Sequence, residues 1–193
     1  MNNTLKKLVL SENKRFLSLI LIFIISLILS ALVYHITGQG SNAAINYEII
    51  SKMKYIDIFL MIIKRNIIYF IAIILLTCIG QSKIINVLFG FTSVYYGLSV
   101  IYLIRTVKLN VKYFALTFTD YFIFFPLLFY FTFISSSIAK YTKKTKNIET
   151  ISHKFDIIVN SYIKLSLIYV LTVIAYSLCY SYYILIISRL LVR

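Results

Sequence analysis

The sequence predicts an all-α polytopic membrane protein with about five transmembrane helices. Of its 193 residues, 61% are hydrophobic and 17% aromatic, and its mean hydropathy is +0.90. A soluble domain of this size has too little interior to bury that fraction. Because a membrane-spanning helix needs roughly 20 apolar residues, the apolar runs account for about five spans in one transmembrane domain, residues 1–193.

The first apolar run covers residues 16–36 and reads FLSLILIFIISLILSALVYHI. Basic residues precede it, so it resembles a signal peptide. Its apolar core is longer than the usual secretory one, and no small-x-small cleavage site follows it. We therefore expect an uncleaved first span.

A polar connector containing GQGSN follows, and its second half, residues 43–57, has the spaced apolar residues of an interfacial helix. The second apolar run, residues 58–80, contains Lys64 and Arg65. The residues after Arg65 alone are too few to cross a bilayer. The basic pair is therefore expected below the membrane surface.

The third run, residues 84–104, follows the short link QSK, which predicts an antiparallel hairpin of spans two and three. Gly90 and Gly97 lie seven residues apart and hence on one helix face. Small residues on such a face allow another helix to approach closely. Glycine is also an ordinary component of membrane helices, so both interpretations stay open.

The fourth run, residues 113–139, contains Asp120 and the only proline, Pro126, which would bend the helix where neighbouring helices accommodate it. A basic loop follows at residues 140–154. The last run is expected to cross the membrane at residues 162–187. An interfacial helix followed by a span is the alternative.

The twenty Lys and Arg residues face only six acids, giving a net charge of +14. They flank the apolar runs instead of forming one stripe, which indicates a lipid bilayer as partner and no nucleic acid. The two densest basic clusters, at the N-terminus and at residues 140–154, fall on the same side of the predicted topology. The positive-inside rule then places the N-terminus in the cytoplasm and the C-terminus outside the cell membrane.

Motifs of the common catalytic sites do not occur in this sequence: GxxxxGK, HExxH and GxSxG are all missing. The predicted topology places His35 and His153 on opposite membrane faces, so they cannot share a metal. Cys78 and Cys179 lie within apolar runs, where cysteine usually behaves as a small hydrophobe. We therefore expect a protein without enzymatic activity, cofactor or metal.

Ionisable residues inside the membrane are the candidate site. Burying one in lipid costs roughly 3 kcal/mol or more, so it usually faces a partner charge, protein or water. Counted from the starts of their runs, Lys64 and Asp120 both lie about 10 Å along their helices. We therefore predict that Asp120 pairs with Lys64 or Arg65. Alternatively, the basic pair extends to the headgroups and Asp120 reaches water.

The order of these features resembles the stage II sporulation protein M family over roughly residues 10 to 190. The likeness is carried by IFLMIIKRNIIYFIAIILLTCIG, by VLFGFTSVYYG and by DYFIFFPLL, with Gly80, Gly90, Gly97 and Pro126 at the expected places. One stretch departs from the family pattern. Thr119, Asp120 and Tyr121 stand where the family often has proline, then His or Gln, then Gly or Asn.

The resemblance implies a non-enzymatic multipass membrane protein that localises cell-wall hydrolases at the septal membrane during spore engulfment. It also implies an alternative, because relatives beside circular-bacteriocin genes look like maturation, export or immunity components. A further alternative is a subunit of an ABC-type transporter whose basic loop, residues 140–154, contacts a cytosolic ATPase. The expected partners are thus a cell-wall hydrolase complex or an ATPase.

Overall fold

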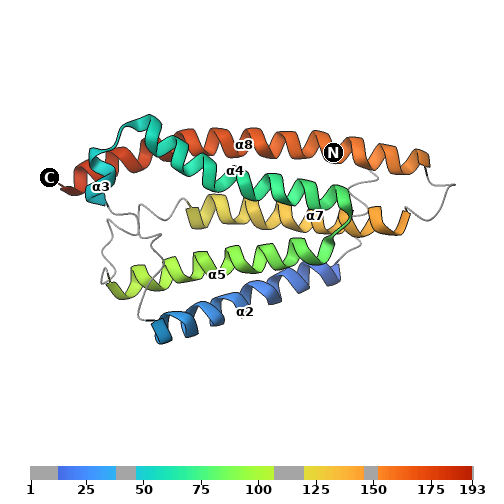
Figure 1. Cartoon of the computed structure of the whole chain (residues 1–193), viewed down its shortest axis with the longest axis horizontal. Helices are drawn as coiled ribbons and strands as arrows, with labels where there is room; N and C mark the ends of the chain where they lie inside the picture. The colour runs from blue at the N-terminus through green and yellow to red at the C-terminus, as the bar shows by residue number, and fades with distance from the viewer. Residues whose placement is uncertain (1–12, 38–46, 107–119, 146–151, 193) are drawn as a thin grey trace.

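The structure, a computed structural model, describes residues 13–37, 47–106, 120–145 and 152–192 (Figure 1). These residues contain helices and no strand: α2 (Asn13–Thr37), α3 (Tyr47–Lys52), α4 (Tyr55–Ile79), α5 (Ser82–Thr106), the π-helical turn η1 (Asp120–Phe124), α7 (Phe125–Thr145) and α8 (Ser152–Val192). The helices α2, α4, α5, α7 and α8 are long and apolar enough to cross a membrane. The predicted all-α polytopic fold is confirmed, and the protein is a multipass membrane protein.

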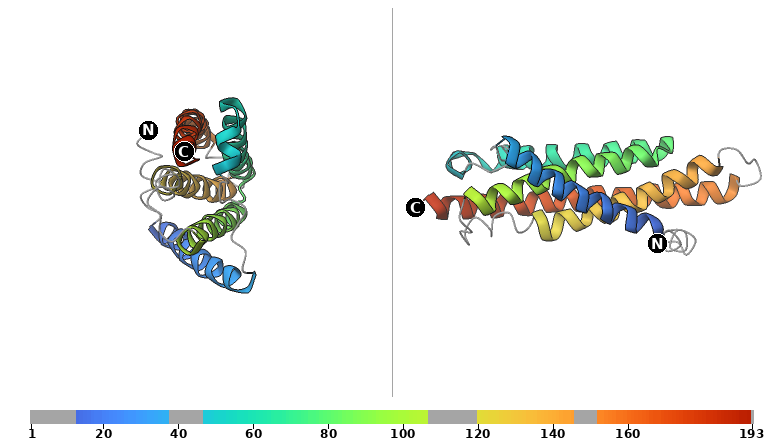
Figure 2. Two further views of the ribbon diagram at one scale, coloured as in Figure 1. Left: turned by 90° about the vertical axis from the view of Figure 1, so that its left-hand side faces the viewer. Right: turned by 90° about the horizontal axis from the view of Figure 1, so that it is seen from below.

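Helix α7 lies at the centre of the bundle. Seen along the bundle axis in Figure 2, α4 and α8 lie on one side of it and α5 and α2 on the other. Helix α2 packs chiefly against α5, whereas α4 packs against α8 and α7. The spanning helices alternate in direction, so α2, α5 and α8 run one way and α4 and α7 the other (Figure 1).

The turn between α4 and α5 follows from one glycine. Gly80 adopts the left-handed conformation, with φ 83° and ψ 23°, which other residues adopt only at a cost. Its N–H donates to the Thr77 carbonyl at 3.0 Å, and the Gln81 N–H donates to the Leu76 carbonyl at 2.9 Å. This Schellman pattern ends α4, so that α5 starts at Ser82 and the predicted tight hairpin forms.

Helices α2, α4 and α5 begin and end within three residues of the first three predicted spans, which were residues 16–36, 58–80 and 84–104. Residues 113–119 of the fourth predicted span lie outside the described residues. The predicted basic loop, residues 140–154, is helical at both ends: α7 continues to Thr145 and α8 begins at Ser152, and residues 146–151 lie outside the described part. A polar helix can extend beyond the bilayer when a neighbouring helix packs against it, which apolar run lengths do not show.

The last helix is longer than a single crossing requires. Helix α8 has 41 residues and is therefore about 60 Å long, twice the roughly 30 Å of bilayer hydrocarbon. It is continuous through residues 162–187, so the alternative of a separate interfacial helix followed by a span is not what the structure shows.

The predicted interfacial helix at residues 43–57 is divided. Residues 43–46 lie outside the described part, α3 ends at Lys52, and α4 begins at Tyr55. Helix α3 packs against α8. With the start of α4 they form a small hydrophobic core, which we call the α3 cluster: Ile50, Ile58, Ile62, Tyr180, Ile184 and Leu185.

The proline of the fourth span lies just after an irregular turn. Pro126 has no N–H to donate to the carbonyl four residues earlier, and the π-helical turn η1 ends at Phe124. Wide turns of this kind occur inside α-helices where the regular hydrogen bonding is interrupted. Pro126 itself is exposed. The predicted effect of Pro126 on helix bending and packing stays a prediction.

Candidate functional site

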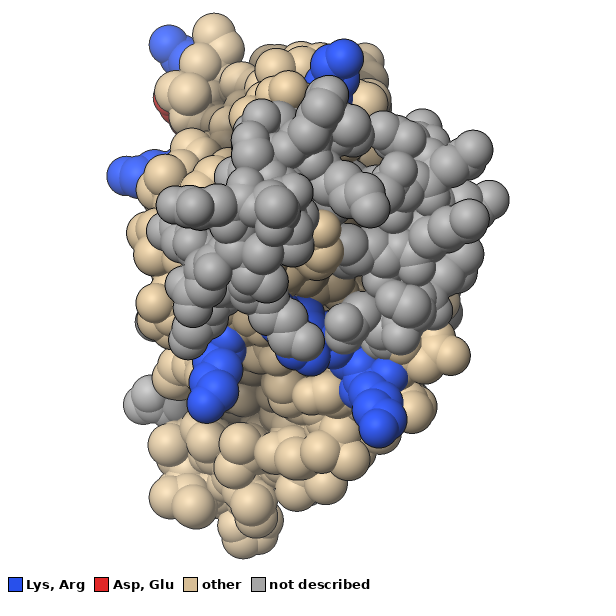
Figure 3. Space-filling view, turned by 90° about the vertical axis from the view of Figure 1, so that its right-hand side faces the viewer, with Lys and Arg blue, Asp and Glu red and all other residues tan. Residues whose placement is uncertain are grey.

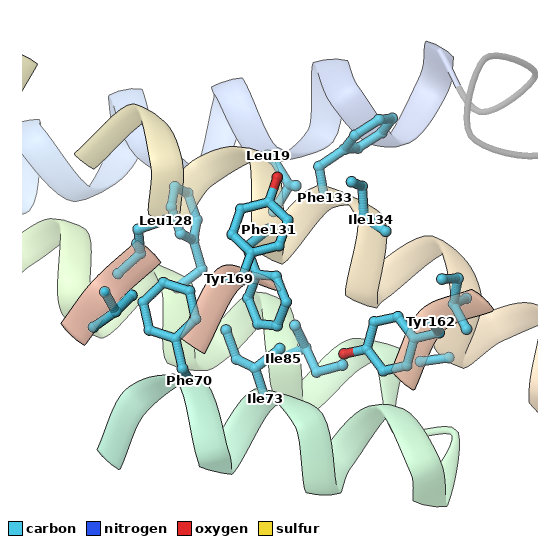
Figure 4. Packing of buried hydrophobic residues seen from close by; sticks show 14 of the residues in the cluster. Leu19, Phe70, Ile73, Ile85, Leu128, Phe131, Phe133, Ile134, Tyr162 and Tyr169 are labelled. Carbon is cyan, nitrogen blue, oxygen red and sulfur yellow. The ribbon is translucent and has the colours of Figure 1, made fainter. Parts of the chain in front are cut away.

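Aromatic side chains around α7 fill the interior of the bundle (Figure 4). The Phe131 ring lies 4.8 Å from the Phe70 ring of α4 and 4.7 Å from the Tyr169 ring of α8, measured between centroids. On the other side of α7, Phe129 contacts Phe89 of α5 at 5.5 Å. Such contacts bury large apolar areas and fix ring geometry. The aromatic run around Asp120 and Pro126 thus supplies the core of the fold.

A set of polar side chains crosses one end of this core. Tyr162 of α8 shares hydrogen bonds with Ser135 of α7, at 2.9 Å, and with Thr77 of α4, at 3.1 Å. Ser135 and Tyr162 are buried, and so is Thr77, whose hydroxyl donates to the Ile73 carbonyl at 2.7 Å. Three helices are therefore joined through one tyrosine hydroxyl.

The neighbouring serine joins the remaining two spanning helices. The Ser136 hydroxyl donates to Asn86 Oδ1 at 2.9 Å and lies 3.2 Å from the Ser82 hydroxyl, both on α5. Arg15 of α2 donates from Nη1 to the Ser136 carbonyl at 2.5 Å. We call this set, which draws on all five spanning helices, the polar layer: Arg15, Thr77, Ser82, Asn86, Ser135, Ser136 and Tyr162.

Beyond the polar layer, α7 and α8 continue as a pair that projects past the α4–α5 turn (Figure 1). Helix α7 runs nine residues further, from Ser136 to Thr145, and α8 begins ten residues before Tyr162. At 1.5 Å per residue, the pair extends roughly 14 Å. We call it the basic hairpin, because the sequence places Lys140, Lys143, Lys144 and Lys154 on these two helix ends.

The two glycines of the predicted packing face lie against α2. Ser26 donates to the Gly90 carbonyl at 3.1 Å, and Ser30 donates to the Val94 carbonyl at 3.0 Å. A Cβ atom placed on Gly97 would lie 2.9 Å from the Ser30 Cβ and within clashing distance of its hydroxyl. At Gly90 the nearest atom, on Ile22, would be 3.4 Å away. Helix α2 thus approaches α5 most closely at Gly97.

Of the predicted intramembrane charge pair, the structure describes the side chains of the basic partners only. Lys64 and Arg65 are exposed on α4, and Arg65 Nε donates to Asn66 Oδ1 at 3.1 Å. Asp120 begins η1, but its side chain lies outside the described part. The pair stays a prediction. Exchanging the charges, Arg65→Asp with Asp120→Arg, should restore the stability lost in each single variant, and failure there and in the Lys64 exchange would count against it.

The register of α4 against α7 bears on that pair. The hydroxyl of Tyr69 lies 3.3 Å from that of Thr132, and the two helices are parallel. Counting back from this contact places position 120 level with Asp57, so roughly 10 Å of helix separates it from the level of Lys64. Aromatic packing sets this offset, whereas the prediction counted depth from the starts of the apolar runs. A direct pair would need both side chains to extend along the bundle.

Within the described residues, no group of three or more His, Cys, Asp or Glu side chains is placed to hold a metal. His35 lies in the last turn of α2, and position 153 lies in the first turn of α8, at the other end of the bundle (Figure 1). Cys78 and Cys179 are both exposed and free.

The polar layer did not emerge from the sequence. Two sequence features could have indicated it. Three consecutive serines, Ser135, Ser136 and Ser137, interrupt one apolar run, and Asn86 lies near the start of another apolar run. Serine has no strong preference in membrane helices, so only the register between helices shows which serines meet a partner. Ser137 is buried without a partner among the described residues, although it belongs to the same run.

Comparison with known proteins adds no assignment. No family model matches the sequence, and neither a curated protein nor a solved structure matches the chain. The roles of the polar layer, the α3 cluster and the basic hairpin therefore have to be inferred from their own geometry and charge.

Proposed function

We propose that the protein is a non-enzymatic multipass scaffold or accessory subunit of the stage II sporulation protein M type, which anchors partner proteins at the bacterial cell membrane. The observation that supports this proposal is the α3 cluster. It holds α3 against the ends of α4 and α8 through six buried side chains. Residence in lipid alone does not require a second core of this kind.

The α3 cluster lies at the far end of one crossing, because its α8 residues Tyr180, Ile184 and Leu185 are about 27 to 35 Å along the helix from Tyr162. From Tyr162 in the polar layer to Val192, α8 is about 45 Å long, so in an upright bundle roughly 15 Å extends past the hydrocarbon. Figure 1 shows α3 and this end of α8 beyond the end of α2. Under the positive-inside rule, we place the polar layer at the cytoplasmic face and the α3 cluster outside. A wall hydrolase would meet the protein there.

The basic hairpin favours a second candidate function. It projects roughly 14 Å from the opposite, cytoplasmic end and is supported by the buried side chains of Ile138 and Thr142. A basic projection suits an acidic surface on a soluble protein, because complementary charge guides such encounters. In an ABC-type or circular-bacteriocin system, that protein would be a cytosolic ATPase.

Affinity purification in mild detergent distinguishes the two functions, because they use opposite ends of the molecule. The native chain is compared with Lys52→Glu/Lys54→Glu, beside the α3 cluster, and with Lys143→Glu/Lys144→Glu in the basic hairpin. Each variant reverses two charges. We expect a cell-wall hydrolase to co-purify with the native chain and the hairpin variant, and to be lost from the α3 variant.

Co-purification of an ATPase that only the hairpin variant loses would overturn the scaffold proposal in favour of transport. A hydrolase bound equally well by all three proteins would show that the α3 end is not the contact surface.

A further inference from the structure

Five cationic side chains surround the bundle at the level of the polar layer. They come from four helices and, except for the half-buried Arg15, are exposed. We call them the basic rim: Lys14, Arg15, Lys83, Lys140 and Lys164. Figure 3 views the molecule from this end, and blue Lys and Arg side chains gather below the grey atoms.

Hydrogen bonds place these cations close to the level of the polar layer. Arg15 bonds to Ser136, beside which Ser82 precedes Lys83. Lys140 lies four residues beyond Ser136, about 6 Å along α7, and Lys164 lies two residues from Tyr162, about 3 Å along α8. The headgroup region on one side of a bilayer is about 5 to 7 Å thick. Because α7 and α8 run in opposite directions, Lys140 and Lys164 lie on opposite sides of this level, and the backbone positions of the rim span about 10 Å. Flexible lysine stems can bring the ammonium groups into one headgroup layer.

Next to the rim, toward the middle of the bundle, the exposed surface is apolar. Leu17 of α2, Ile84 of α5 and Leu167 of α8 are 64%, 46% and 59% exposed. Each lies within three residues of a rim cation on the same helix. The change from cationic to apolar surface, which is sharpest on α2 and α5, locates the boundary between headgroups and hydrocarbon.

The charge near this level is cationic among the described side chains. Asp57 is the one acid whose side chain the structure describes, and it lies at the start of α4, at the opposite end. The sequence also places Glu12, Glu149 and Asp156 in segments that flank the rim. They are fewer than the five cations and belong to parts whose side chains lie outside the description.

Arg15 differs from the four lysines, because its guanidinium is held by the Ser136 carbonyl of α7. This bond fixes the first turn of α2 against the central helix. The lysines, in contrast, lie at the surface with flexible stems that can reach phosphate groups. The rim thus combines one anchored cation with four adaptable ones.

We infer that the basic rim binds the phosphate groups of anionic phospholipids and so selects an anionic leaflet at this end of the bundle. Each Lys or Arg near an anionic surface adds roughly a factor of five to the attraction. This inference does not depend on which protein partner the α3 cluster or the basic hairpin contacts. The lipids would instead determine how the bundle sits when those partners arrive.

The test measures lipid selection by the full-length protein in bilayers. The protein is reconstituted in phosphatidylcholine mixed with phosphatidylglycerol in equal parts, and spin-labelled analogues of both lipids report their relative association. We expect the native chain to prefer phosphatidylglycerol several-fold. Lys14→Gln/Lys83→Gln/Lys164→Gln should lower that preference by about fivefold or more, and added salt should weaken the native preference because it screens exposed charges.

The matched control removes three cations from the other end: Lys52→Gln/Lys54→Gln/Arg189→Gln. All six side chains in the two variants are exposed, so neither triple change removes buried packing, and thermal unfolding in detergent checks that both fold. The control should keep the native preference. An equal preference for the two lipids in the native chain, or an equal loss in both variants, would refute lipid binding by the rim.

Discussion

At the scale of single residues, the contact between α2 and α5 depends on the absence of a side chain at Gly97. A Cβ added there meets the Ser30 Cβ at 2.9 Å and Leu27 Cδ2 at 3.2 Å. Both neighbours belong to α2, so the helices would have to separate. Membrane helices associate through close packing of this kind and not through expulsion of water.

Gly97→Ala should therefore lower the free energy of unfolding by about 1 to 3 kcal/mol, the usual effect of overpacking. Gly90→Ala is the matched control, because its nearest contact would be an ordinary 3.4 Å and alanine favours helix by about 1 kcal/mol over glycine. Unfolding in detergent, followed by circular dichroism, measures both. Equal stabilities of the two variants would contradict close packing at Gly97, and Ser30→Gly should rescue Gly97→Ala.

At the scale of helices, the polar layer fixes how α4, α7 and α8 are aligned. The Tyr162 hydroxyl connects Ser135 and Thr77, and its ring stacks on Phe131 at 6.4 Å between centroids. A shift of one residue in any of the three helices would break the connection. In an apolar bundle, such hydrogen bonds select one register among several that aromatic packing would tolerate.

Tyr162→Phe keeps the ring and removes the hydroxyl, so Ser135 loses its partner. We expect a loss of about 1 kcal/mol in stability, within the range measured for hydrogen bonds in membrane proteins. Tyr130→Phe is the control, because Tyr130 is exposed on the same central helix, α7. The hydroxyl of Tyr162 would have no structural role if both variants unfolded at the same temperature in the same detergent.

The extent to which sequence predicts this fold differs from helix to helix. Long apolar runs make helices the only way to satisfy the backbone in lipid, and Gly80 followed by a polar link predicts the α4–α5 turn. The continuation of α7 past Ala139 and the start of α8 at Ser152 lie in polar sequence. The burial of Ile138 and Thr142 at that end of α7 depends on how the helices pack, which neither apolar run shows alone.

The candidate site was less predictable than the fold. Charged residues are rare and costly in membrane spans, so Lys64, Arg65 and Asp120 were predicted as the candidate site. Serine and tyrosine carry no such signal, because each is tolerated in a membrane helix with or without a partner. Arg15 was predicted only as part of a basic N-terminus, whereas its bond to Ser136 depends on the packing of helices more than 100 residues apart in the chain.

At the scale of the whole molecule, five alternating spans place the two ends of the described chain at opposite ends of the bundle, as Figure 2 shows. The end with the polar layer carries the basic rim together with the basic hairpin. The other end carries Lys52, Lys54 and Arg189 with Asp57 nearby. Positive charge concentrated beside short spans is retained in the cytoplasm during insertion.

We therefore expect the hairpin end to face the cytoplasm and the α3 end to face outward. In a chain with Cys78 and Cys179 replaced by serine, single cysteines are introduced as Lys52→Cys or Lys140→Cys, both at exposed positions. A membrane-impermeant maleimide applied to intact cells should label position 52, whereas position 140 should react only after the membrane is permeabilised. The cysteine-free chain sets the background, and the reverse labelling pattern would invert the orientation and move the proposed lipid contacts to the outer leaflet.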